Sequence, residues 1–365
     1  KIMDEQANME EGGSSSVGRM TEAWQTGMDM LMKSPLRFHQ RMQYSQPWFL
    51  TLDETGSISP LFRSFGNAVP RQEGSPLYWH FLSQTVLLHC QASEGKDQDW
   101  EELLASLARN KRRMPLRGMI VLLSLSDLEK RSDEELALLG QRLRSRAQQV
   151  MLSLSRRYPV YVLVQDLESL PGMNDVMSVV PSATLDRPLG LLTADAEGEV
   201  GRRCADSAAS TLENAVRAAA AAGDLPHGDM LRAVRELRLF GEKLELVLEG
   251  LTREVAHQVT PILRGVFFCP SPSAEDGRTK FLSGILSRVL PASTQPASLS
   301  GGLPFYASTK VVLMTAWLTL MLFICGLFAV NTVYQHHVLT VEAASDMADV
   351  SHDDTYNRLY KEMLY

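Results

Sequence analysis

The residues best placed for chemistry follow a short apolar run, Pro47 to Leu52, which has the composition of a β-strand. The residues after it, with Leu61, Phe62 and Phe65 beyond them, predict a tight turn and then a helix. Such a turn points backbone N–H groups and a helix N-terminus at an anion, so a nucleotide-hydrolysing protein would bind its phosphates here.

A working phosphate loop needs glycines for close backbone approach, a lysine for the phosphates and a serine or threonine for magnesium. The residues that stand in this turn are Asp53, Glu54, Ile58, Ser59 and Pro60. The carboxylates of Asp53 and Glu54 at the mouth of the turn would repel a nucleotide. The turn therefore argues against nucleotide chemistry.

A second candidate strand, Thr85 to Leu88, is followed directly by His89 and Cys90. A phosphate-loop enzyme would place a magnesium-linked aspartate at this strand end, and this chain has His89. A metal or nucleophile pair of His89 and Cys90 is disfavoured, because adjacent strand residues point to opposite faces. We interpret His89 as a surface or packing histidine. His89, Asp53 and Glu54 are the polar candidates near the place where a nucleotide would bind.

The elements that would position these residues predict a parallel sheet. Gly118 to Leu125 and Tyr158 to Val164 are continuous apolar runs, the pattern of strands buried on both faces. Between them, Ser132 and Glu135 form a capping box at the start of a long amphipathic helix. Strand, helix and strand make a βαβ unit, so we expect a doubly wound α/β domain.

The second half of the chain predicts mainly helices. Periodicity fades from Met177 to Cys204, which we interpret as a loop or a poorly ordered insertion. The remaining predicted elements are a helix over Ser210–Ala222, one helix or two broken near Gly241 over Asp229–His257, a strand ending Pro261–Cys269 and an amphipathic helix over Thr279–Leu290.

Val311 to Val333 is an uncharged stretch of about 23 residues, long enough at 1.5 Å per residue to cross a roughly 30 Å hydrocarbon core. A buried soluble helix of this length would normally show a polar face. Basic residues precede the stretch, and the segment just after it is acidic with no Lys or Arg before Arg358. This asymmetry predicts that the N-terminal side is cytoplasmic.

The charge and the cysteine spacing argue against nucleic-acid-binding, zinc-binding and disulfide-bonded proteins. The net charge of −7 and the pI near 5.7 argue against general nucleic-acid binding, which usually needs a basic face. The four cysteines lack CxxC spacing, which suggests neither a zinc site nor a disulfide framework and fits reduced thiols. The chain starts at Lys1 without a visible signal peptide, so we expect an internal part of a longer chain.

Six stretches of the chain form an ordered set: PWFL at Pro47–Leu50, Trp79 and Phe81 ahead of TVLL, RGMIVLLSLSDL at Arg117–Leu128, YPVYVLVQDLESLPGM at Tyr158–Met173, PILRGVFF at Pro261–Phe268 and FLSGILSRVLP at Phe281–Pro291. In this set the chain resembles the IcmF/TssM inner-membrane proteins of type VI secretion systems and of the related Dot/Icm type IV system. Each is weak alone, but the ordered set followed by a membrane helix is specific.

The resemblance implies a P-loop-NTPase-like domain, from which this chain departs in three places. Only Gly56 and Ser57 remain of the phosphate loop, and its Lys and Thr positions are Ser59 and Pro60. The magnesium-strand aspartate aligns with His89. The base-reading motif aligns with Gln165, Asp166, Leu167 and Glu168, which retain only the final acid. These three departures from the family pattern imply a pseudo-NTPase with no cofactor, no metal and no catalytic residue.

The resemblance also implies the organisation of the chain. Two membrane spans would precede Lys1, and the expected parts are a flexible linker at 1–19, a helical lead-in at 20–45, the pseudo-NTPase domain at 46–175, the loop or insertion at 176–208, a helical extension with one strand at 209–290, a tether at 291–310, the membrane helix at 311–333 and the start of a periplasmic region at 334–365.

By the same resemblance, the function is that of a structural scaffold in the bacterial inner membrane. Its expected partners are a DotU/TssL-type inner-membrane protein, a TssJ-type outer-membrane lipoprotein, baseplate components and further copies of itself in a ring. Two alternatives stay open. One is an active ATPase or GTPase that energises secretion through an unusual loop, and the other is a membrane-tethered sensor.

Overall fold

The computed structural model describes residues 19–31, 33, 47–53, 68–69, 75–82, 84–91, 97–110, 116–193, 198–223, 228–255, 258–271, 280–292, 297–298 and 305–364. The chain divides into two compact units, Lys1–Leu299 and Ser300–Tyr365. The residues Glu54, Gly56, Ser57, Ser59 and Pro60, on which the phosphate-loop prediction falls, lie outside the described part.

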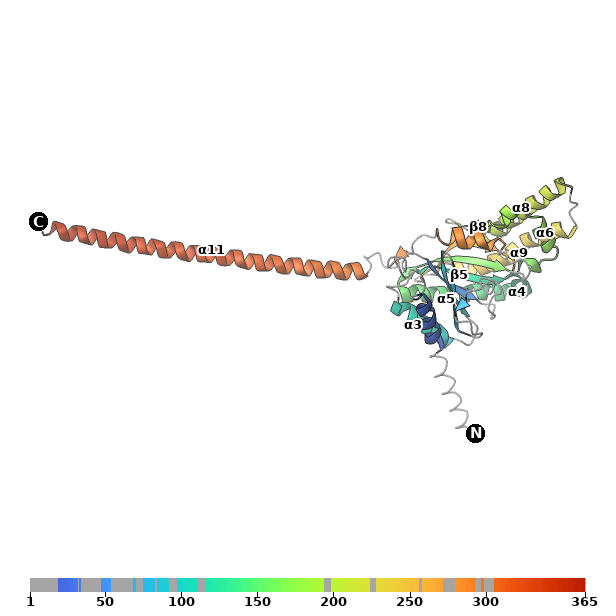
Figure 1. The fold of residues 1–365 in the computed structure, drawn as a ribbon, viewed down its shortest axis with the longest axis horizontal. Coiled ribbons are helices and arrows are strands. Elements are labelled where there is room, and N and C mark those ends of the chain that lie inside the picture. Colours follow the sequence, from blue (N-terminus) through green and yellow to red (C-terminus); the bar gives the residue numbers. More distant parts are fainter. Residues whose placement is uncertain are drawn as a thin grey trace, which may run out of the picture. The chain divides into compact units, whose positions relative to one another are not determined.

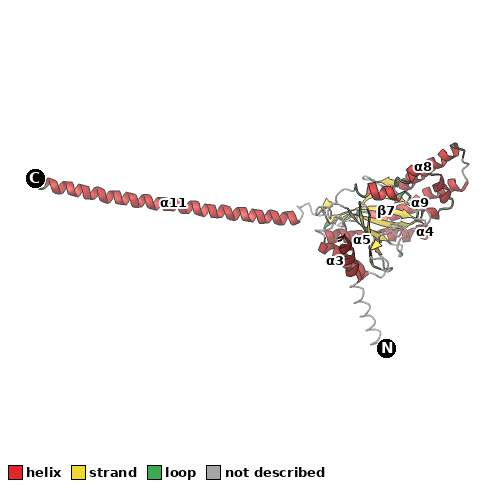
Figure 2. Ribbon diagram, viewed as in Figure 1, coloured by secondary structure: helices red, strands yellow, loops and turns green. Residues whose placement is uncertain are grey.

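The first unit is built on an eight-stranded mixed sheet with helices around it (Figures 1 and 2). The strand order is β2 (Ala68–Val69), β3 (Leu77–Phe81), β4 (Val86–Gln91), β1 (Trp48–Asp53), β5 (Leu116–Ser124), β7 (Pro159–Gln165), β9 (Ile262–Phe268) and β8 (Leu189–Leu192). The five strands from β4 to β9 are parallel, while β2, β3 and β8 run antiparallel to their neighbours. The largely parallel α/β sheet that the apolar runs predicted is therefore confirmed.

One helix precedes the first described strand, and the others lie between or after the strands. These helices are residues 19–31, α3 (Asp97–Asn110), α4 (Leu125–Lys130), α5 (Asp133–Leu154), α6 (Met173–Val179), α7 (Ser182–Leu185), α8 (Val200–Ala221), α9 (Gly228–Thr252) and α10 (Leu282–Gly284). The predicted capping box is present at the start of α5, where the Ser132 N–H donates to the Glu135 carboxylate at 2.9 Å. The hydrogen bonds from Ser132 hold the pKa of Glu135 below its usual value.

The two faces of the sheet have different cores, because side chains alternate along each strand. On the face that we call the helical face, Trp48, Leu50 and Leu52 of β1 join residues of α3, α5, α8 and α9 in one large cluster. On the opposite face, which we call the second face, a smaller cluster gathers Phe49, Ile120 and Phe267 against Leu282 and Ile285. The central strands are thus buried on both sides.

The structure corrects the prediction of a loop over residues 177–204. This segment contains the end of α6, the helix α7, the antiparallel edge strand β8 and the first turn of α8. The sequence signal is weak because α8 packs through small residues, Cys204, Ala205 and Ala208, instead of large apolar ones. A 3.6-residue pattern is hard to see when its buried members are small.

The helix α9 is continuous, which settles the alternative of a break near Gly241. A side chain at that position would bring its Cβ to 2.9 Å from the Ala205 Cβ, so Gly241 permits close packing against α8. The predicted helix over Thr279–Leu290 is wrong in detail. Its described part is the short α10 followed by a π-helical turn, η4 (Ile285–Val289), in which the Leu290 N–H donates to the Ile285 carbonyl at 2.9 Å.

The second unit contains α11 (Phe305–Glu362), a helix of 58 residues with no proline and a single glycine, Gly326. Its stretch Leu313–Ser345 has a mean hydropathy of 2.2 in the most apolar part, and that part is not buried by the rest of the chain. By length and composition α11 can cross a membrane. The predicted span Val311–Val333 lies within it.

The crossing of α5 and α9 yields a stability prediction. Alanine at Gly140 would place its Cβ 2.3 Å from the Val247 carbonyl oxygen, and alanine at Gly250 would place it 2.8 Å from that of Ala137. Backbone atoms cannot rotate away, so each substitution should destabilise the domain by on the order of 1–3 kcal/mol despite alanine's better helix propensity. Urea unfolding of the Lys1–Leu299 unit measures this effect.

Gly228→Ala is the matched control, because no atom of another described element lies within 4 Å of the added Cβ at the start of α9. Equal unfolding free energies for Gly140→Ala and Gly228→Ala would show that the two helices do not cross this closely.

Candidate functional site

The strand order places a switch point at β1. The next parallel strand along the chain, β4, lies on one side of β1, and β5 lies on the other. In open α/β sheets ligands bind outside the carboxyl ends of the strands at such a point. The strand ends that meet there are Asp53 of β1, Gln91 of β4 and Ser124 of β5.

Asp53 and His89 form a buried polar pair at this point. The His89 Nε2 and the Asp53 Oδ2 are 3.0 Å apart, and the two side chains are 0% and 1% exposed. Parallel pairing aligns Thr51 with His89, so Asp53 lies two residues further along the neighbouring strand on the same face. Cys90 points to the helical face, as expected from strand alternation.

Of the two interpretations of His89, packing is therefore confirmed and surface is wrong, because the side chain is buried and bonded to Asp53. The ring centroids of Tyr78 and His80, both on β3, lie 6.2 and 6.1 Å from that of His89. The second face thus carries a buried polar cluster of Asp53, His80, His89 and Tyr78, which we call the histidine cluster. The carboxylate of Asp53 therefore has its partner, His89, within the domain.

Burial, followed by the charge of His89, lowers the pKa of His80 from 6.5 to about 3. An imidazole that is kept from water loses the hydration that stabilises its charged form. His80 is therefore neutral at physiological pH.

A second polar group lies at the carboxyl ends of β5, β7 and β9. The Ser124 hydroxyl donates to Asp166 at 2.6 Å, and the Ser271 hydroxyl donates to the other oxygen of the same carboxylate. The Ser271 N–H donates to Glu168 at 2.9 Å. We call these four residues the Asp166 cluster.

The Asp166 cluster lies where a base-reading motif would be expected. Asp166 has a φ of 65°, a left-handed conformation that costs energy for a residue other than glycine. Its two serine contacts and the Ser271–Glu168 bond join β5, β7 and the segment after β9. Gln165 is buried at the end of β7. The acids of this edge are thus hydrogen-bonded within the domain.

In the described residues, neither cluster has the arrangement of a metal or thiol site. Within the described ranges no three His, Cys, Asp or Glu side chains gather as metal ligands would. Burial, with the nearby charges of Glu168 and Asp166, raises the pKa of the Cys269 thiol well above its ordinary value. A thiol that stays protonated is a poor nucleophile.

Comparison with known proteins gives the family. The sequence model of the IcmF-related N-terminal domain matches residues 93–318, more than half of the chain. The chain belongs to the IcmF-related family. It is also similar to the type VI secretion system component TssM1 of Pseudomonas aeruginosa, with 26% identity over 292 residues. That match covers 68% of this chain and 25% of the relative, so the chain spans about a quarter of the relative's length.

The sequence identified some site residues of this IcmF-related chain and missed others. As the strand pattern predicted, four of them lie at or near the carboxyl ends of the parallel strands, which we call the carboxyl edge: Asp53, His89, Asp166 and Glu168. The structure separates them into two clusters. Sequence reasoning missed His80, Ser124 and Ser271; a hint for Ser124 was its position at the end of a buried strand.

The Asp53–His89 pair is predicted to stabilise the fold. Asp53→Leu or His89→Leu leaves a buried polar partner behind and should cost about 3–5 kcal/mol each, whereas the double leucine variant should cost clearly less than the two single costs together. Urea unfolding of the four proteins measures the coupling. Single costs that simply add in the double variant would contradict a direct pair.

The His80 imidazole predicts a pH dependence. Its folded pKa of about 3 is below the unfolded value of 6.5, so the unfolded chain binds the extra proton between these values. Stability should therefore fall as the pH drops from 6.5 towards 3, by up to about 1.4 kcal/mol per pH unit. His80→Phe should remove this contribution in unfolding experiments at several pH values. An unchanged slope in His80→Phe would contradict it.

Proposed function

We propose that this chain is an inner-membrane scaffold component of a type VI secretion apparatus, whose α/β domain docks partner proteins without hydrolysing nucleotide. Membership of the IcmF-related family and the similarity to TssM1 support the assignment to such an apparatus. The proposal that the domain does not hydrolyse nucleotide is based on one observation. At the carboxyl ends of the parallel strands, the carboxylates of Asp53, Asp166 and Glu168 are hydrogen-bonded to other residues of the domain.

A nucleotide-hydrolysing domain needs a magnesium-linked carboxylate and an acid that faces the base, both open to the ligand. At the corresponding strand ends here, His89 binds Asp53 and Glu168 accepts the Ser271 N–H. Binding a nucleotide would require these contacts to break, the first of them fully buried, and the turn has no lysine to compensate the phosphate charge. This supports a fold of P-loop-NTPase type that serves as a docking domain.

The membrane location of the scaffold rests on α11. Its apolar stretch provides a span, and the distribution of basic and acidic residues around the stretch favours a cytoplasmic α/β domain and a periplasmic C-terminal end. Such an orientation would present the domain to baseplate components and a DotU/TssL-type membrane protein. The far side would face a TssJ-type lipoprotein. Several copies would form the core of the complex.

The proposal predicts that the purified Lys1–Leu299 unit gives no heat of binding with ATP or GTP and magnesium up to millimolar concentration in calorimetry. The full chain, co-expressed with a DotU/TssL-type protein, should co-purify with it from detergent-solubilised membranes. No nucleotide should bind because the polar groups at the carboxyl edge are already hydrogen-bonded within the domain. The partner protein should still bind because docking uses the outer surface of the domain.

Gly56→Ala and Ser57→Ala serve as controls for the calorimetry. Micromolar binding that disappears in these variants would mean an active nucleotide site and would support the ATPase or GTPase alternative. A third outcome would instead favour a membrane-tethered sensor. In it, the partner does not co-purify and a small ligand changes the fluorescence of the domain.

A further inference from the structure

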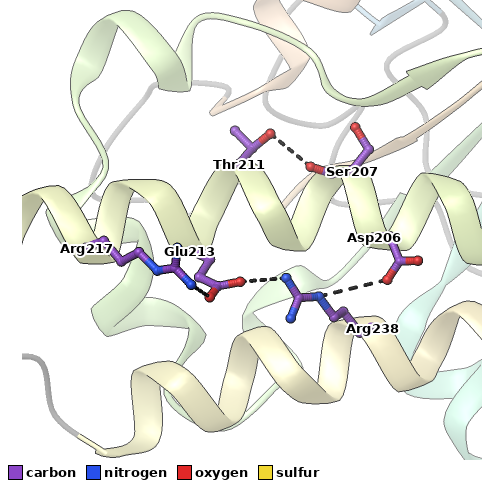
Figure 3. Close-up of polar contacts among 6 residues, drawn as sticks. All are labelled: Asp206, Ser207, Thr211, Glu213, Arg217 and Arg238. Carbon is purple, nitrogen blue, oxygen red and sulfur yellow. Dashed lines mark hydrogen bonds and ion pairs between the residues drawn. The ribbon is translucent and has the colours of Figure 1, made fainter.

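The helices α8 and α9 are held together by charged contacts on one side. Arg238 of α9 donates to Glu213 of α8 at 2.5 Å and lies 3.9 Å from Asp206, and Arg217 also contacts Glu213 (Figure 3). Arg232 is paired with Glu236 at 2.8 Å along α9. These arginines are therefore occupied within the domain.

The outer face of α9 is different. Leu231, Arg235, Leu239, Glu242 and Leu246 recur at spacings of four, four, three and four residues, which places them in one line along the helix. We call this line the α9 stripe. Leu231 and Leu239 are 52% and 58% exposed, and Leu246 is half-buried at the end of the line.

The charges of the α9 stripe make one long ion pair with the other described residues. In the part of the chain that the structure describes, Arg235 makes no ion pair, unlike Arg232 and Arg238 on either side of it. Glu242 is 67% exposed, and its contact to Arg202 of α8 is long, at 3.8 Å. Both groups are thus available to a partner surface.

The order of residues in the α9 stripe makes it complementary to itself. Each end of the stripe has a leucine, Leu231 or Leu246, followed inward by a charged residue, Arg235 or Glu242. The two charged residues have opposite signs, and Leu239 lies beside the midpoint between them. When two such helices pack antiparallel, Leu231 lies opposite Leu246 and Arg235 lies opposite Glu242 of the other copy. A two-fold contact makes each of these pairs twice.

We propose that the α9 stripe is a contact surface between two copies of this chain, packed antiparallel about a two-fold axis beside Leu239. The two Leu239 side chains meet at the axis, flanked on each side by an Arg235–Glu242 pair. Arg238, which also lies near the axis, does not repel its copy strongly because Glu213 and Asp206 already balance its charge. The inference rests on the proposed scaffold function, in which several copies share one membrane.

The size of the contact suits a membrane-bound chain. From Leu231 to Leu246 the helix extends about 24 Å, so a single helix pair buries much less than the roughly 1,200–2,000 Å² of a stable soluble complex. Two copies anchored in one membrane are held at a high effective concentration, which makes a weak contact effective. The dimer should therefore form in membranes and not in dilute solution.

The test is site-specific cross-linking of the full chain in membranes. Cys325 is first replaced by serine, since it is the exposed cysteine of the four, and Leu239→Cys is then introduced. A short bis-maleimide should link two copies through position 239. Leu152→Cys on α5 is the matched control, because Leu152 is 55% exposed and lies outside the α9 stripe. Its cross-linked fraction should be at least about fivefold lower.

Charge reversal tests the antiparallel register. Arg235→Glu or Glu242→Arg, each in the Leu239→Cys chain, should lower the cross-linked fraction about fivefold, because two attractive pairs become repulsive. The double variant Arg235→Glu/Glu242→Arg should restore it. Both positions are exposed, so thermal unfolding of the variants should stay close to that of the parent chain.

Equal cross-linking at positions 239 and 152, or no recovery in the double variant, would overturn the α9 contact. The scaffold function is judged separately by co-purification with the DotU/TssL-type protein. A chain that co-purifies but does not cross-link through position 239 would remain a scaffold with another contact between its copies.

Discussion

The central strands of this domain are buried on both faces, and this burial constrains every polar side chain they carry. A polar group that leaves water and finds no partner costs free energy, so it must be hydrogen-bonded within the protein. On β1, Asp53 is almost fully buried and bonds to His89 of the next strand. At the ends of β5 and β7, Ser124 and Asp166 satisfy each other. The internal pairs at the carboxyl edge follow from this constraint.

The same edge is where an open α/β sheet usually offers polar groups to a ligand. A group used for an internal contact must break that contact before it can bind a ligand. In the histidine cluster and the Asp166 cluster, polar side chains bond to one another and so stabilise the strand ends. Under the proposed docking function, partner proteins would bind the outer surfaces of the helices and not this edge of the sheet.

The sequence predicted most of the sheet because β1, β5 and β7 are apolar runs of strand length. It missed β8 and the start of α8, where small residues such as Ala205 and Ala208 carry the packing. It identified Asp53 and His89 as separate polar residues and could not pair them, because their contact depends on the register of two strands 36 residues apart. Ser271 was missed for the same reason, since its partner Asp166 is 105 residues away.

The uninterrupted course of α11 has a mechanical consequence. A straight helix of 58 residues is about 87 Å long, nearly three times the thickness of a hydrocarbon core. Without proline it has no built-in hinge, and its backbone hydrogen bonds resist stretching along the axis. Such a rod would carry a push, tilt or rotation from one surface of a bilayer to the other with little loss. A load applied beyond one surface would thus be felt beyond the other without any bond being made or broken.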